Sequence, residues 1–123
     1  MAKLIGLFHR KPGTSAEEFR DYYEDHHAPF AYSLFGHLFA SYTRNYVDAG
    51  QAAGQTRVVD AGIDVVTEIV FHDDAAMREM FAMAERDPEL REAIATDESA
   101  FMDREASQVL LVTDHRSSPI GPG

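Results

Sequence analysis

Cysteine is absent from this 123-residue sequence. Its absence excludes disulfide bonds, a thiolate nucleophile and zinc sites built on cysteine. It is also typical of proteins in a reducing compartment, so we expect the chain to be cytoplasmic.

Basic residues are few, because 11 Lys and Arg stand against 21 Asp and Glu and give a formal net charge of −10 at pH 7. Such a negative field repels phosphate backbones and anionic lipid surfaces. We therefore expect neither a nucleic acid nor a membrane as a partner.

Long hydrophobic runs are missing, since no apolar stretch approaches the roughly 20 residues that a membrane-spanning helix needs. The apolar run at residues 3–8 is too short for the core of a signal peptide, and charged residues follow it directly. The sequence also lacks Gly-x-Gly-x-x-Gly, phosphate-loop and Gly-x-Ser-x-Gly motifs. We expect a soluble domain that needs no organic cofactor.

Hydrophobic residues make up 45% of the chain, and its length is that of one domain. We expect a single domain over residues 1–116 and a flexible C-terminal tail over residues 117–123, which are rich in Ser, Pro and Gly.

The first part of the chain predicts a strand followed by a helix. Residues 3–10 form a short apolar run that ends at a Lys-Pro-Gly turn. Thr14 and Ser15 are each followed three residues later by a glutamate, Glu17 or Glu18, which predicts a capping box at the start of a helix. Pro29 disfavours helical geometry at the residue before it, so we expect this helix to end at Ala28 and the aromatic residues to position 38 to be irregular.

The rest of the chain predicts three further strands, at residues 39–47, 63–72 and 108–114. Asp73 and Asp74 precede one helix, and Asp87-Pro88 begins another, with a break near Thr96-Asp97. The glycine-containing segment 48–62 is long for a loop in so small a domain, and we expect it to cover a pocket.

The order β-α-β-β-α-(α)-β is that of a ferredoxin-like, split βαβ α+β fold, with a four-stranded antiparallel sheet and helices on one face. The strand at 63–72 has apolar residues on both faces, so the open face needs cover as well. Two sheets packed face to face in a homodimer would supply it.

Three stretches of sequence together resemble the EthD-domain family, a branch of the dimeric α+β barrel superfamily, over roughly residues 3–115. The first stretch is Lys11-Pro12-Gly13, Glu18-Phe19-Arg20, Tyr23 and His27-Ala28-Pro29; the second is Tyr42-Thr43-Arg44-Asn45; the third is Asp64-Val65-Val66-Thr67-Glu68 with Phe71.

The resemblance implies a protomer that dimerises through its sheet and holds a small apolar pocket between sheet and helices. The superfamily includes cofactor-free polyketide cyclases, muconolactone isomerases, dehydratases, quinone-forming monooxygenases and haem degraders. EthD-like members appear among ether-degradation accessory proteins and in dehydratase or decarboxylase steps of aromatic polyketide pathways. A fold of this kind does not fix one reaction.

Two adjacent histidines are the candidate proton carriers, because imidazole exchanges protons near neutral pH. Helical spacing places His26 near the middle of the buried face, seven residues after Phe19. The family motif instead points to His27, four residues after Tyr23, and we favour His27 as catalytic and His26 as substrate-binding. The alternative is a histidine that only interacts with the helix dipole.

A metal site is not expected. Adjacent histidines on a helix point about 100° apart, whereas metal ligands must converge from separate turns. The remaining histidines are scattered, at positions 9, 37, 72 and 115.

Other polar residues could bind or polarise a substrate oxygen. Tyr23 is a catalytic candidate and Tyr42 a binding candidate, since a phenol donates to a carbonyl or enolate oxygen, although both could simply pack in the core. Arg44 and Asn45 could hold a carboxylate or phenolate, but their side chains point to opposite faces of the strand.

Two acids share a face of the strand at 63–72. If Glu68 were buried without a partner its pKa would rise, which would make it a proton carrier at neutral pH; Asp64 is a binding candidate. The alternative is an edge or interface residue paired with Arg44 or solvated. Asp97 and Glu98 are interpreted as residues of a helical turn rather than of a site.

The sequence therefore predicts a cofactor-independent acid–base enzyme, a lyase or dehydratase, cyclase or isomerase, acting on an aromatic, polyketide-like or lactone small molecule. The alternatives are a cofactor-free monooxygenase of a phenolic substrate, and a non-catalytic dimeric accessory protein that binds a small hydrophobic ligand.

Overall fold

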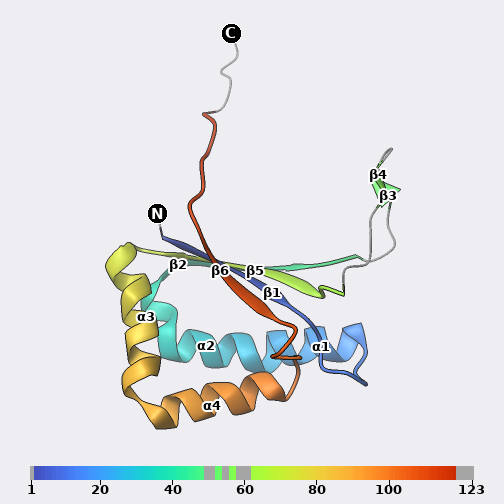
Figure 1. Cartoon of the computed structure of the whole chain (residues 1–123), viewed down its shortest axis with the longest axis horizontal. Coiled ribbons are helices and arrows are strands. Elements are labelled where there is room, and N and C mark those ends of the chain that lie inside the picture. The colour runs from blue at the N-terminus through green and yellow to red at the C-terminus, as the bar shows by residue number, and fades with distance from the viewer. Residues whose placement is uncertain (1, 49–51, 54–55, 58–61, 119–123) are drawn as a thin grey trace.

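The computed structural model describes residues 2–48, 52–53, 56–57 and 62–118. Its main sheet has four strands, and helices cover one face of it (Figure 1). The strands are β1 (Lys3–Phe8), β2 (Phe39–Tyr46), β5 (Val65–Phe71) and β6 (Gln108–Val112). The helical segments are α1 (Ala16–Tyr22), the π-helical turn η1 (Tyr23–His27), α2 (Ala28–Phe35), the short 3₁₀ turn η2 (Gly36–Leu38), α3 (Asp74–Arg86) and α4 (Pro88–Ser99).

The strand order in the sheet is β2-β5-β1-β6, and each neighbouring pair is antiparallel. This order confirms the predicted ferredoxin-like α+β fold. The strands are shorter than predicted by one or two residues at several ends. Beyond β1, for example, Arg10 forms only an isolated bridge to Met102.

The prediction that the first helix ends at Ala28 is wrong. Helical structure continues through α1, η1 and α2 to Phe35. In η1 the hydrogen-bond ladder widens by one residue, and the N–H of Ala28 reaches the carbonyl of Tyr23. Pro29 then lies in the first turn of α2, where a missing N–H costs little. The segment expected to be irregular is therefore helical.

The two C-terminal helices begin where the sequence predicts. Asp73 accepts a hydrogen bond from the N–H of Ala76, and Asp87 accepts from the N–H groups at the start of α4. The predicted break near Thr96 is wrong, because α4 continues to Ser99. The carboxylate of Asp97 bonds to other helices instead of competing for its own backbone.

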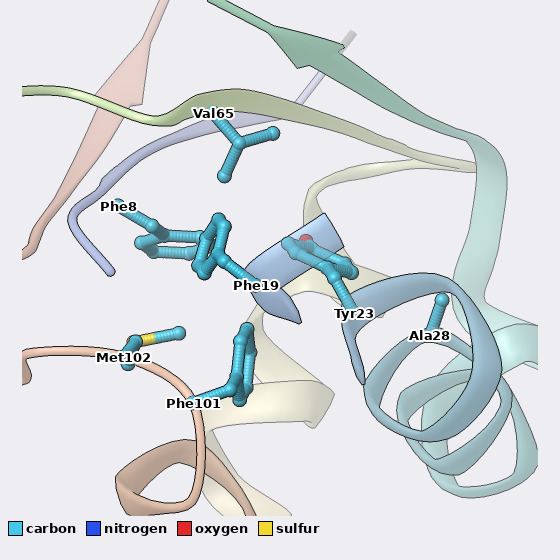
Figure 2. Close-up of a cluster of buried hydrophobic side chains, with 7 residues drawn as sticks. All are labelled: Phe8, Phe19, Tyr23, Ala28, Val65, Phe101 and Met102. Atoms are coloured by element: carbon cyan, nitrogen blue, oxygen red, sulfur yellow. The ribbon is translucent and has the colours of Figure 1, made fainter. Parts of the chain in front are cut away.

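The helix-covered face of the sheet carries the core. One cluster of buried side chains joins β1 and β5 to the run of helices and to the segment after α4 (Figure 2); its members are Phe8, Phe19, Tyr23, Ala28, Val65, Phe101 and Met102. A second cluster lies beside it and includes Leu4, Phe35, Phe39 and Phe71, packed against Met77, Met80 and Met83 of α3. The three methionines pack against this second cluster.

The segment 48–62 contains two short antiparallel strands, β3 (Ala52–Ala53) and β4 (Thr56–Arg57). The prediction that this segment covers a pocket falls largely on residues outside the described part of the chain, as does the end of the predicted tail. Within the described residues, no helix is both long and apolar enough to cross a lipid bilayer.

Candidate functional site

A cavity of about 250 Å³ lies between the helix-covered face of the sheet and the helices. Most of its walls are apolar: Leu4, Phe8, Phe30, Ala31, Leu34, Phe35, Phe39, Ile69, Met80, Phe81, Ala84, Ile94 and Val109. Five residues add polar groups: Tyr23, His27, Tyr42, Thr67 and Glu98. Such a cavity, mainly apolar with a few converging polar groups, is the usual form of a small-molecule site.

The π-helical turn η1 gives the two adjacent histidines different surroundings. His27 is buried and lines the cavity, and its ring packs against Tyr23 and Phe101. His26 is exposed, and its ring lies against Tyr22 with 4.9 Å between ring centres. His26 does not line the cavity, so only His27 is placed to meet a molecule inside it.

Asp97 of α4 holds the ring of His27. Its Oδ2 lies 2.5 Å from Nδ1 of His27, and both side chains are mostly buried. The hydroxyl of Tyr22 donates to Oδ1 of the same carboxylate at 3.0 Å. With Asp97 ionised, Nδ1 carries the proton and donates to it, which leaves Nε2 as the nitrogen that can accept a proton.

The sequence analysis did not identify Asp97 as a site residue. One sequence signal was available, because Asp97 continues the helical spacing of Leu90, Ile94 and Phe101, which places it on the inward face of α4. A carboxylate on an inward face needs a partner, and His27, 70 residues earlier, supplies it.

A chain of hydroxyl groups links η1 to the sheet beside the cavity. The hydroxyl of Tyr23 lies 2.7 Å from that of Thr67 and 3.0 Å from that of Tyr42. Burial raises the pKa of Tyr23 to about 12 and raises the pKa of Tyr42 further. These phenols therefore stay neutral at physiological pH and can donate hydrogen bonds. Thr67 is a polar residue of the cavity that the sequence analysis missed.

Glu98 is the second carboxyl group that the sequence analysis missed. It lines the cavity, and its Oε1 lies 3.3 Å from Nε of Arg104. Burial raises the pKa of Glu98, while the charges of Arg104 and His27 act in the opposite direction. The sequence predicts Glu68 as a proton carrier. Glu98 is the better-placed candidate, because it lines the cavity and Glu68 does not.

Arg44 faces the helices but does not line the cavity. Its guanidinium donates to both carboxylate oxygens of Glu24, at 2.9 and 2.7 Å. Hydrogen bonds from Arg44, and a further one from the hydroxyl of Tyr46, hold the pKa of Glu24 below its usual range. The guanidinium also lies over the ring of Tyr42, 4.7 Å from its centre, so Arg44 supports that ring.

The remaining predicted site residues lie away from the cavity. Glu68 pairs with Nζ of Lys3 at 3.0 Å and accepts from the side chain of Asn45 at 3.1 Å, on the open face of the sheet. The prediction of a raised pKa for Glu68 is wrong, because the hydrogen bonds from Lys3 and Asn45 lower it. Asp64 accepts from the backbone N–H of Arg10 at 2.7 Å.

Across the described residues, no group of three or more histidine and acidic side chains is arranged to hold a metal ion. Every fully buried side-chain nitrogen or oxygen in the same part of the chain has a hydrogen-bond partner. The fully buried donors and acceptors around the cavity are therefore paired with neighbouring protein groups.

The fold and the cavity define a ferredoxin-like α+β protein with a mainly apolar cavity between its sheet and its helices. The model of the EthD domain matches residues 11–105, so the chain belongs to the EthD domain family. This confirms the resemblance noted in the sequence. Among curated proteins the sequence has no match.

Solved structures of two proteins share the fold. An ethyl tert-butyl ether d (EthD) family protein of Bacillus halodurans superposes with a TM-score of 0.62 at 16% identity, over 94% of this chain and 99% of that one. A hypothetical protein of Arabidopsis thaliana gives 0.61 in its crystal structure, at 18% identity over 97% of this chain and 100% of that one. Its solution structure gives 0.58, at 17% identity over 96% and 91%.

Proposed function

We propose that this protein is a cofactor-independent acid–base enzyme, a lyase or dehydratase, cyclase or isomerase, with His27 as its catalytic acid and base. The observation that carries the proposal is the pairing of Nδ1 of His27 with Asp97 at the wall of the apolar cavity. The pairing fixes the ring and its tautomer, so that Nε2 serves as the base.

The cavity supports an aromatic, polyketide-like or lactone substrate. Its aromatic and aliphatic walls favour an apolar molecule, and its hydroxyl groups can hold a carbonyl or phenol oxygen. Tyr42 and Thr67 both bond to the hydroxyl of Tyr23 and are therefore fixed in direction before a ligand arrives. Because Tyr23 has one hydroxyl proton, one of the two accepts that proton and keeps its own for a ligand. Donors fixed in this way stabilise negative charge that develops on an oxygen.

In a dehydration, Nε2 of His27 would take the proton from a carbon next to the substrate carbonyl as the C–H bond breaks. Asp97 keeps the imidazolium in place while the hydroxyls of Tyr42 or Thr67 hold the enolate oxygen. The imidazolium then returns the proton to the departing hydroxyl group, the C–O bond breaks, and water leaves with the histidine restored.

We also propose that the protein acts as a homodimer through the open face of its sheet. Register places Ile5, Leu7, Val66, Val70 and Leu110 on that face, opposite the helices. A dimer in which two such faces pack together would remove this apolar surface from water.

Replacement of His27 tests the catalytic proposal. We expect His27→Ala to lower turnover at least about a hundredfold, in line with the usual contribution of an acid–base group. His26→Ala is the matched control and should keep near wild-type turnover, because His26 is exposed and outside the cavity. The assay follows a panel of β-hydroxy ketones, phenolic polyketides and lactones by absorbance and mass spectrometry. A folded His27→Ala protein with full turnover would refute the assignment.

The same panel separates the alternatives. Turnover that stops when dioxygen is removed would indicate a cofactor-free monooxygenase of a phenol. Tight binding without turnover, with or without dioxygen, would indicate an accessory protein that carries a small hydrophobic ligand.

A further inference from the structure

The polar side chains of the cavity lining are all at least partly buried, whereas its two exposed residues are apolar. Thr67 is 1% exposed and His27 is 9% exposed. Phe81 of α3 and Val109 of β6 line the same cavity but are 42% and 54% exposed. The site therefore changes along its length from buried hydroxyl and imidazole groups to apolar side chains at a mouth.

The strand register connects the two ends. Thr67 of β5 and Val109 of β6 both pair with Gly6 of β1, so the three residues form one row across the sheet. Two strand spacings separate the outer two, a span of about 10 Å.

Gly6 contributes no side chain to this row, and the ring of Phe8 occupies the space above it. A Cβ at Gly6 would lie only 2.3 Å from Cζ of Phe8. The floor between the polar end and the mouth is therefore an aromatic surface.

The chemistry of the lining limits what can occupy the mouth. None of the described residues that line the cavity is Lys or Arg, so an anionic group at the mouth would find no cationic partner in the lining. Phe81 and Val109 come from different elements and leave apolar surface in water, which an aliphatic chain lying between them would cover.

We propose that the substrate is amphipathic, with an oxygen-bearing aromatic head at His27 and Thr67 and an unbranched aliphatic tail that runs over Phe8 to the mouth between Phe81 and Val109. The head rests on the proposed function. The tail rests on the row of residues across the sheet and on the apolar mouth.

Binding of para-n-alkylphenols of increasing chain length, measured by calorimetry, tests the tail. Burial of each methylene should tighten binding about fourfold, the equivalent of about 0.8 kcal/mol, until the chain passes the mouth. Affinity that does not change with chain length in the wild-type protein overturns the proposal.

Variants at the mouth locate the tail. Val109→Asp should abolish the gain in affinity with chain length, and Phe81→Gln should reduce that gain. Val47→Asp is the matched control, because Val47 is 41% exposed but does not line the cavity. An undiminished gain in folded Val109→Asp and Phe81→Gln proteins would also overturn the proposal.

A parallel series of 1-alkanols separates the tail from the head. If alkanols gain affinity with length and phenols bind no better than alkanols, the tail site is supported and the aromatic head of the proposed function is refuted. Loss of turnover in His27→Ala with the gain per methylene unchanged would support both.

Discussion

His27 and Asp97 stand 70 positions apart in the chain, yet their side chains meet at 2.5 Å. A second bond, from the hydroxyl of Tyr22, holds the other oxygen of the carboxylate. Asp97 does not line the cavity, so in the proposed reaction it would be a positioning residue that acts through the imidazole. Its contribution is to keep the proton on Nδ1 and the lone pair on Nε2.

We expect Asp97→Asn to lower turnover by a hundredfold or more while the protein stays folded. An amide can donate its N–H to Nδ1, which moves the ring proton to Nε2 and removes the base. Nitrogen-15 NMR of histidine-labelled protein measures the tautomer of His27 directly, alongside turnover. Glu92→Gln, the same chemical change at an exposed position of α4, should alter neither. Unchanged turnover with the proton still on Nδ1 would contradict the positioning role.

Residue type and spacing identified only part of this site. The motif histidine at His27 and the phenols of Tyr23 and Tyr42 do lie at the cavity. Their catalytic and binding roles stay predictions. Glu68 lies elsewhere, on the open face of the sheet. The sequence could not show that Lys3 comes within 3.0 Å of it there. A carboxylate that gains such a partner stays ionised and is not available as a proton carrier.

At the scale of elements, the π-helical turn η1 decides which histidine faces the cavity. A regular helix advances about 100° per residue, and periodicity on that basis favours His26. The wider turn shifts the following residues around the axis and places His27 inward. In the sequence, the residue next to this turn that stands out is Pro29. Its presence predicts the end of a helix, but in the structure Pro29 lies in the first turn of α2.

The bonds from Tyr23 to Thr67 and Tyr42 tie η1 to β5 and β2, and they predict a loss of stability at alkaline pH. Burial raises the pKa of Tyr23 from 10.0 to about 12, so the unfolded chain loses this proton first as the pH rises. The contribution of the Tyr23 phenol to the free energy of unfolding is complete below pH 10. It decreases between about pH 10 and 12, by on the order of 2 to 3 kcal/mol. Urea unfolding across this range measures it.

Two phenylalanine variants isolate the source of this pH dependence. Tyr23→Phe should make the alkaline decrease less steep, because one buried phenol is removed while that of Tyr42 remains. It should also lower stability at pH 8, because Thr67 and Tyr42 lose a shared partner. Tyr32→Phe removes an exposed phenol and should leave the pH profile as it is in the wild-type protein. An alkaline decrease as steep in Tyr23→Phe as in the wild type would contradict the assignment.

At the scale of the whole molecule, the sheet is covered by helices on one side only (Figure 1). The open side combines apolar residues with the paired charges of Lys3 and Glu68. Leu110 lies at the edge of this side and is 42% exposed. The proposed dimer would bury this surface and leave the cavity on the other side of the sheet unchanged.

We expect Leu110→Glu to shift the protein from dimer to monomer in sedimentation measurements at micromolar concentration. A charge placed in an apolar interface loses its hydration without gaining a partner. Leu111→Glu is the matched control, because the next residue of β6 points to the opposite face of the sheet. A wild-type protein that sediments as a monomer would refute the dimer.

The order of the four strands of the main sheet, the starts of α3 and α4 and the resemblance to the EthD domain family could be predicted from the sequence, whereas the helix α2 could not. Caps such as Ser15, Asp73 and Asp87 act on backbone groups within three residues, so a short window of sequence contains all the interacting groups.

Which polar groups meet depends on the packing of helices and strands that lie far apart in the chain. The partners of His27, Glu68 and Arg44 come from other elements of the chain, and each pairing depends on how helices and strands pack. The physical reason is that local patterns fix backbone geometry over a few residues, whereas the state of a buried polar group depends on what lies across the core from it.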